Sequence, residues 1–247
     1  MRRIAFVTGD MGGKLYLGSK RETPNGPEYS KHEYAAYGDA RVSASEIRGG
    51  INKLLEEIPE RTRKHQVYDS WMPNVVSRNF ENVDEAVDFI GYEKIFFPKL
   101  NYPCEGITVV ATGVPKDDSI PFERVSDDEE YLLGEVSMNA IQRYHSDPDY
   151  WFETMTHIFT EHSASDKNAV TMGYSNKAEF SAEERKVGER TFSILYEEDP
   201  HFYEGYRKKI EVFWQERGVF YMFHIVYGEE LCEEAERIAQ KWMESFP

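Results

Sequence analysis

Apolar residues recur along this chain at two spacings, and polar turn residues separate the segments. Short apolar runs at residues 3–8 and 14–17 flank the glycine-rich segment 9–13, a pattern that predicts an antiparallel hairpin. Further strands are expected near residues 66–71, 74–76, 94–98, 106–112, 191–196 and 219–227. The polar segments 18–40, 114–125 and 163–180 are expected to be loops.

Helix starts are the clearest local signals. Ser43, Asn82, Ser126 and Ser181 are each followed three residues later by Glu, which is the spacing of a capping box. Asp-Pro pairs at 147–148 and 199–200 also favour a helix start, because proline at the first helical position has no N–H to leave unbonded. These signals predict helices over residues 43–58, 83–90, 127–144, 148–162, 182–190, 200–216 and 229–244.

This order of elements predicts an α+β fold, with a mixed or antiparallel sheet packed against several amphipathic helices and a helix-rich second half. A chain of 247 residues is long enough to form a single domain over residues 1–247. The change of character near residues 113–126 offers an alternative domain boundary.

Composition places the chain among soluble proteins. Hydrophobic residues make up 40% of it, which is too many for a disordered chain, and no apolar run approaches the roughly 20 residues that span a bilayer. With only Cys104 and Cys232, no disulfide framework is expected, and a cytoplasmic location is the simplest interpretation.

The net charge of −16 is unevenly distributed. Residues 1–64 contain 12 Lys and Arg against 9 Asp and Glu, whereas residues 65–247 contain 17 against 36. This acidity argues against general nucleic-acid binding, which needs a basic surface. Combined with 16 Tyr residues, several in polar context, it indicates a protein-binding surface for a basic partner, although an ordinary acidic surface is the simpler explanation.

A candidate phosphate-binding loop is formed by Gly12, Gly13 and Lys14 after the first strand. Backbone N–H groups and a lysine suit an anion, but the spacing from Gly9 is one residue short of the Walker pattern and Leu15 replaces the usual Ser or Thr. The preceding Val7, Thr8 and Gly9 resemble the first strand of nucleoside-triphosphate pyrophosphatases that clear non-standard purines. A hairpin turn remains the favoured interpretation of this segment.

A second candidate site lies on the helix expected at 148–162. Glu153, His157 and Glu161 recur every four residues, so a helix would place all three on one face. Carboxylates with an imidazole can bind a divalent metal or act in acid–base catalysis. A solvated helix face is the alternative explanation, and His224 in the strand 219–227 is expected to be a hydrogen-bonded core residue.

The acidic run over residues 229–236 resembles one half of the magnesium site of all-α nucleotide pyrophosphatases, but the chain contains no matching half after it. Glutamates at the start of a helix, where they oppose the helix dipole, explain the run better.

The favoured hypothesis is a protein that acts by binding, such as an inhibitor or immunity-type protein that covers the basic site of a nuclease or defence enzyme. One alternative is a metal-dependent hydrolase or transferase acting on a nucleotide or another phosphorylated small molecule. Another is a structural subunit of a larger, viral assembly, in which the protein would oligomerise.

Overall fold

The fold is described from a computed structural model. The backbone is described over residues 3–9, 14–23, 26–36, 41–58, 74–116, 130–147, 149–163, 170–173, 179–203 and 205–247. Side chains are described within this set over residues 41–58, 74–116, 130–147, 149–163, 181–198 and 208–247.

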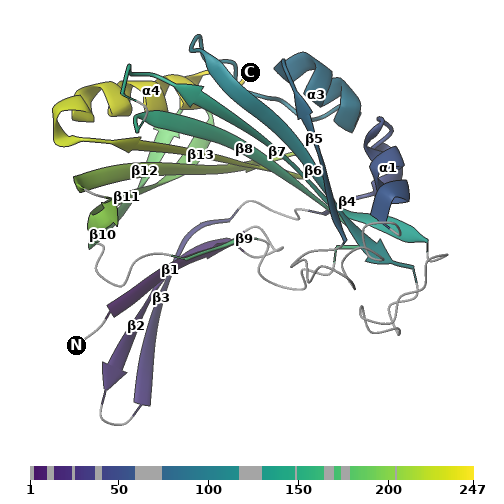
Figure 1. Cartoon of the computed structure of the whole chain (residues 1–247). Coiled ribbons are helices and arrows are strands. Elements are labelled where there is room, and N and C mark those ends of the chain that lie inside the picture. Colours follow the sequence, from purple (N-terminus) through teal and green to yellow (C-terminus); the bar gives the residue numbers. More distant parts are fainter. Residues whose placement is uncertain are drawn as a thin grey trace.

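A large antiparallel sheet dominates the structure (Figure 1). Its hydrogen-bonded order is β10-β11-β12-β13-β8-β7-β6-β5, and the short ninth strand, β4, pairs in parallel with β8. Its strands, in chain order, are β4 (Arg41–Val42), β5 (Val75–Phe80), β6 (Cys104–Pro115), β7 (Tyr131–Arg143), β8 (Trp151–Thr160), β10 (Glu179–Val187), β11 (Arg190–Tyr203), β12 (Gly205–Glu216) and β13 (Val219–Tyr227). The sheet therefore consists of two meanders, β5–β8 and β10–β13, joined where β13 pairs with β8.

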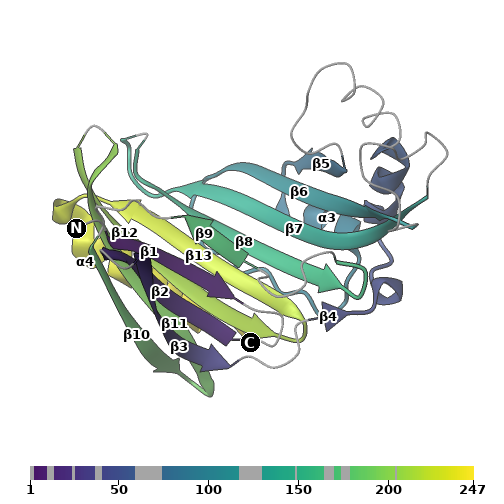
Figure 2. The same ribbon diagram turned by 90° about the horizontal axis from the view of Figure 1, so that it is seen from below.

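A second, four-stranded sheet has the order β3-β2-β1-β9. Its strands are β1 (Arg3–Gly9), β2 (Lys14–Thr23), β3 (Gly26–Ala36) and β9 (Val170–Gly173). β3 contacts β10 and β11, and Figure 1 shows the smaller sheet below that end of the larger one. Seen from below in Figure 2, the smaller sheet leaves β6, β7 and β8 in clear view.

The helices lie on the opposite face of the large sheet (Figure 1). They are η1 (Ala44–Glu46), α1 (Ile51–Leu54), η2 (Leu55–Glu57), α3 (Val83–Ile90), η4 (Glu229–Leu231) and α4 (Cys232–Glu244), the η elements being 3₁₀ turns. α3 contacts β5, β6 and β7, and α4 contacts β12 and β13. We call this side the helix face and the other side the underside.

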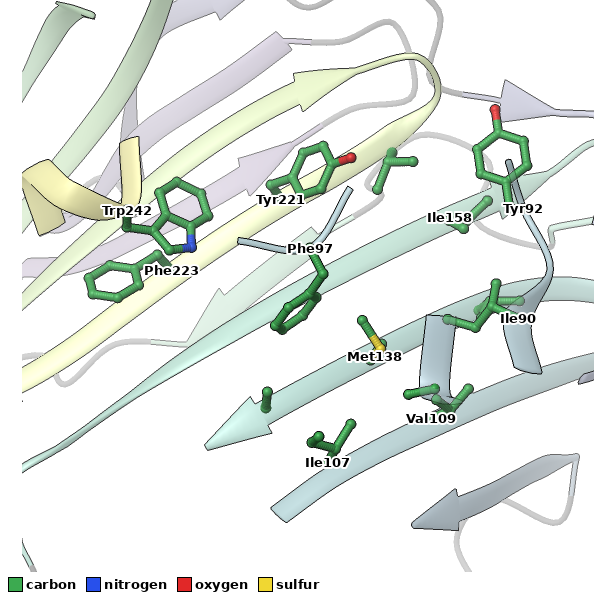
Figure 3. Close-up of a cluster of buried hydrophobic side chains, with 14 of the residues drawn as sticks. Ile90, Tyr92, Phe97, Ile107, Val109, Met138, Ile158, Tyr221, Phe223 and Trp242 are labelled. Atoms are coloured by element: carbon green, nitrogen blue, oxygen red, sulfur yellow. The ribbon is translucent and has the colours of Figure 1, made fainter. Parts of the chain in front are cut away.

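The main core lies between the sheet and these helices, as Figure 3 shows. Trp242 of α4 is fully buried, and its ring lies 5.5 Å from Phe223 of β13 and 4.9 Å from Phe246. Around α3, Ile90 is fully buried in the same cluster as Val109 of β6. Burial of large aromatic and aliphatic side chains therefore attaches both helices to one face of the sheet.

Local capping explains why α3 begins and ends where it does. The Asn82 side chain accepts a hydrogen bond from the Glu85 N–H at 2.8 Å, as the capping signal predicts. Gly91 ends the helix with φ 68°, where a Cβ would lie 2.2 Å from the backbone nitrogen of Gly49. The predicted helix 83–90 is thus confirmed, as are the strands within 106–112, 191–196 and 219–227.

The prediction of an α+β fold with a helix-rich second half is wrong. The structure is mostly antiparallel sheet, and its α-helices are short. Residues 127–144, 148–162, 182–190 and 200–216 were expected to be helical, but their described parts form β7, β8, β10 and strands β11–β12. Of the helices predicted in the second half, only the last persists, as η4 and α4.

The error at β8 has a physical cause. Phe152, Ile158 and the threonines between them face the core, while Trp151 and Met155 alternate with them on the underside. Because both faces carry apolar residues, the sequence matches a helical stripe as well as a strand. The Thr, Phe, Trp and Ile content of the segment favours a strand, and pairing with β7 and β13 stabilises that conformation.

Other predictions have mixed outcomes. The hairpin of β1 and β2 is confirmed, but the expected loop 18–40 contains the end of β2 and all of β3. The segment 94–98 is not a strand, and residues 66–71 and 126–129 lie outside the described residues. Within the described part of the chain, no helix is long and apolar enough to cross a membrane.

Candidate functional site

The underside of the large sheet carries a second set of buried side chains. Phe159, Leu195, Phe213, Phe220, Met222 and Val226 are at most 5% exposed, yet all lie outside the main core cluster. Successive side chains of a strand point to opposite faces of the sheet, and side chains at paired positions of neighbouring strands share a face. The register of β11, β12, β13 and β8 therefore places these residues on the underside.

A row of ionisable residues crosses this apolar surface. Glu197 of β11 is paired with Lys209 of β12, and Glu211 of β12 is paired with His224 of β13, which is itself paired with Glu153 of β8. The Lys209 Nζ lies 2.6 Å from a Glu197 carboxylate oxygen and 3.3 Å from one of Glu211. Glu197 and Glu211 are each 3% exposed. Charges so deep are costly unless they are paired, which explains why Lys209 lies between two carboxylates.

The ammonium of Lys209 stays charged in this setting. Burial acts to lower its pKa, but the carboxylates of Glu211 and Glu197 outweigh burial and raise the pKa above its ordinary value. This half of the row is therefore an electrostatically satisfied ion-pair network.

The other half of the row, Glu153 with His224, is different. The His224 Nδ1 lies 3.7 Å from a Glu153 carboxyl oxygen, which is beyond hydrogen-bond distance. Burial raises the pKa of Glu153 to about 7. Burial, and after it the charge of Lys209, lower the pKa of His224 to about 3. His224 is therefore neutral near pH 7, whereas Glu153 is about half protonated there. Among the described residues no hydrogen bond reaches the Glu153 carboxyl.

The surroundings of Glu153 are apolar and partly open. Its side chain is 13% exposed. Ile141 of β7 is its cross-strand neighbour and, at 39% exposure, is the one exposed large hydrophobic residue among those described. Trp151 and Met155 flank Glu153 on the same face of β8, and the Trp151 ring lies 4.8 Å from His224. A carboxyl group thus lies at the edge of an apolar patch, which we call the Glu153 patch (Trp151, Glu153, Met155, Ile141 and His224).

Two further polar groups face the underside without partners in the described structure. The Gln215 side-chain nitrogen and the Asn139 side-chain oxygen are buried and make no hydrogen bond. Gln215 is paired with Phe220, and Asn139 is paired with Met155, so both lie on the same face as the row. Unsatisfied buried polar groups are rare, and a bound water or ion is one of their common explanations.

The structure separates the three residues of the candidate acid–base site. Glu153 and His157 share the underside of β8, but four residues along a strand span about 13 Å. Burial lowers the pKa of His157 against the opposing effect of Glu135, and its ring stacks 6.1 Å from Phe159. The placement on one helix face was wrong because the segment is a strand.

Glu161 lies beyond the end of β8 and has a structural role. Its carboxylate accepts the Ala44 N–H at 2.7 Å and the Ser43 hydroxyl at 3.3 Å. Burial acts to raise the pKa of Glu161, but the hydrogen bonds outweigh burial and hold that pKa below its ordinary range. The described residues contain no group of three or more His, Cys, Asp or Glu side chains that could hold a metal ion.

The candidate phosphate loop falls largely outside the described residues. Gly12 and Gly13 are not described, and Lys14 is described only as the first backbone position of β2. The tyrosines in polar context at 29, 34, 37, 174 and 206 likewise lie outside the described side chains.

Sequence reasoning missed the partner of Glu153. Alternation in the strand 219–227 places His224 on a defined face, but only the pairing of β13 with β8 brings it to Glu153, 71 positions earlier in the chain. Lys209 and Glu211 were missed because a helix was expected there.

Comparison with protein-family models, curated proteins and solved structures gave no match.

Proposed function

We propose that the protein acts by binding, and that the Glu153 patch takes a small amine with an apolar body. The observation that carries this proposal is the Glu153 carboxyl itself, which is nearly buried and has no hydrogen bond within the described structure. A bound ammonium group would supply a positive charge that none of the described side chains places beside this carboxyl.

The energetics favour a cationic ligand over a neutral one. Desolvation is the cause of the raised pKa of Glu153, so ionising this carboxyl is unfavourable until a cation approaches it. His224 does not provide that charge, because its own pKa is lowered to about 3. Lys209 is already shared by two carboxylates.

The apolar part of the ligand is matched by Ile141, Met155 and Trp151. Exposed Ile141 is opposite Glu153, and covering it would remove apolar area from water. A tryptophan ring beside a carboxylate also attracts an ammonium group, since its π face is electron-rich. An arylalkylamine satisfies both requirements.

Calorimetric titration with phenethylamine tests the proposal, with 2-phenylethanol as the neutral matched probe. The amine should bind about tenfold more tightly at pH 8 than at pH 6, because Glu153 with a pKa of about 7 must lose its proton first. Glu153→Gln should abolish the preference for the amine, whereas Glu184→Gln, an exposed carboxyl on β10, should leave it unchanged. Equal binding of the amine and the alcohol would refute the proposal.

A second candidate function is docking of a basic protein partner, and the distribution of charge on the helix face favours it. Residues 81–93 and 229–244, which contain α3 and α4, carry eleven acidic residues against two basic ones. Such a surface speeds the encounter with a basic partner, such as a nuclease, in a salt-dependent way. Exposed Cys104 and half-buried Cys232 are free thiols, which suits a reducing, cytoplasmic setting for this interaction.

Binding to lysozyme, used as a basic probe protein, separates this second function from the first. The affinity should fall steeply between 50 and 300 mM salt, and the triple change Asp84→Asn, Glu85→Gln and Asp88→Asn should weaken it while leaving amine binding intact. An affinity independent of ionic strength would contradict docking on the helix face.

A further inference from the structure

A pocket of about 590 Å³ opens where β4, the segment after α3 and the turn between β12 and β13 meet. Three cationic side chains from these three separate segments line it: Arg41, Lys94 and Arg217. Glu46 is the one carboxylate among its lining residues within the described structure. The chain as a whole has a net charge of −16, whereas the side chains that line this pocket carry more positive than negative charge.

The backbone at Arg217 adopts a conformation that is uncommon for a residue other than glycine. Arg217 and Gly218 form the two-residue turn between β12 and β13, with φ values of 54° and 78°. Arg217 is the one non-glycine residue with positive φ in the described part of the chain. Asn or Gly is the preferred residue at such a position, so an arginine there is at odds with its backbone preference. Conformational strain of this kind is concentrated at functional sites.

The frame of the pocket is fixed by buried contacts. The Tyr92 hydroxyl donates a hydrogen bond of 2.8 Å to the Arg217 carbonyl, which ties the turn to the segment that carries Lys94. Tyr92 is 3% exposed. On the other side, the Arg48 N–H bonds to the Gly91 carbonyl at 3.0 Å. The three cations are therefore held on well-packed elements.

The cations keep the capacity to bind an anion. The Lys94 Nζ lies 2.6 Å from a Glu46 carboxylate oxygen, but its side chain is still 50% exposed. Arg217 is 65% exposed, and its Nε lies 3.7 Å from a Glu216 carboxylate oxygen. Arg41, which lines the same pocket, donates a hydrogen bond of 3.5 Å to the Glu161 carbonyl.

The pocket has room for an anion larger than inorganic phosphate. A volume of about 590 Å³ is in the range of small-molecule sites and exceeds what a single phosphate fills. A smaller cleft of about 150 Å³ shares Glu46, Tyr92 and Lys94 with it, and adds one cation, Arg48, and one carboxylate, Glu93, to the lining. Planar guanidinium groups and a lysine are the side chains that bind phosphate oxygens best. We propose that this pocket binds the phosphate group of a small phosphate monoester, with Arg217, Lys94 and Arg41 as its ligands.

The test is titration calorimetry with ribose 5-phosphate and adenosine monophosphate, beside inorganic phosphate, ribose and adenosine. The two esters should bind, their dephosphorylated forms should not, and the esters should bind more tightly than inorganic phosphate. Arg217→Asn should weaken ester binding at least tenfold. This variant cannot act by misfolding the turn, because Asn suits positive φ and should raise the melting temperature.

Lys94→Met should weaken binding to a similar extent, whereas Lys53→Met, an exposed change on α1, should have no effect. Absence of ester binding at millimolar concentration would overturn the proposal, as would binding that survives both Arg217→Asn and Lys94→Met. Inorganic phosphate binding as tightly as the esters would also overturn it. None of these residues belongs to the Glu153 patch, so this proposal and the proposed function fail separately.

Discussion

Replacing Glu153 by Gln should change how the stability of the protein depends on pH. The pKa of Glu153 rises from an ordinary 4.5 to about 7 in the folded protein because the carboxyl is buried. Between these values the folded state holds a proton that the unfolded chain has released. Unfolding then releases a proton, so stability is highest at or below the unfolded pKa and is lost as pH rises through the folded one.

The size of the effect follows from the shift. Each pKa unit corresponds to 1.36 kcal/mol, so the wild type should lose about 3 kcal/mol between pH 4 and pH 8 through this one group. Gln has nearly the same shape and does not titrate. The free energy of unfolding of Glu153→Gln, relative to the wild type, should therefore increase by about 3 kcal/mol across that range.

Urea unfolding followed by tryptophan fluorescence at closely spaced pH values measures this difference. Nearby His224, Glu211 and Lys209 are present in both proteins, so subtracting the two curves isolates Glu153. Glu184→Gln is the control, since its carboxyl is exposed on β10. Parallel curves for the wild type and Glu153→Gln would refute the reasoning, because they would mean that Glu153 titrates normally.

Three further changes test other parts of the account by urea unfolding. Lys209→Met should cost about 3–5 kcal/mol, because it leaves the carboxylates of Glu197 and Glu211 buried without their ammonium partner; a loss below 1 kcal/mol would contradict the burial of this network. Trp242→Ala should cost about 3–5 kcal/mol, because the fully buried ring packs on Phe223 and Phe246; a small loss would mean that α4 does not complete the core. Asn82→Ala should cost about 1 kcal/mol through the lost cap of α3, whereas no loss would show that this helix start is set by packing alone.

Local signals in the sequence predicted local structure well. The Asn82 cap and Gly91 together define α3 to the residue, because a cap is a contact between residues three or four apart. The strand 219–227 was equally legible, since its continuous apolar run is too rich in aromatic and β-branched residues for a loop.

The long strands of the second half were not predictable in the same way. Residues 151–160 carry apolar side chains on both faces, and the Asp-Pro pair before them imitates a helix start. What decides the conformation is pairing with β7 and β13 and burial on the underside, which are tertiary effects.

The candidate site also depended on strand pairing, which the sequence does not show. Glu153 was selected for its spacing to His157, but the structure brings it instead to His224, on a strand that is distant in sequence. Likewise, Arg41, Lys94 and Arg217 meet in one pocket only through the parallel pairing of β4 with β8 and the turn between β12 and β13. The composition of the sequence indicated a basic first third. It did not indicate that Lys94 and Arg217, from the acidic remainder of the chain, would line a pocket with Arg41.

The most direct test of the central claim is a carbon-13 NMR titration of the Glu153 carboxyl, assigned by its absence in Glu153→Gln. The account predicts a pKa near 7 in the free protein, and a fall in that pKa when phenethylamine is added, because the bound ammonium stabilises the carboxylate. A pKa near 4.5 in the free protein, or a pKa that the amine leaves unchanged, would contradict it.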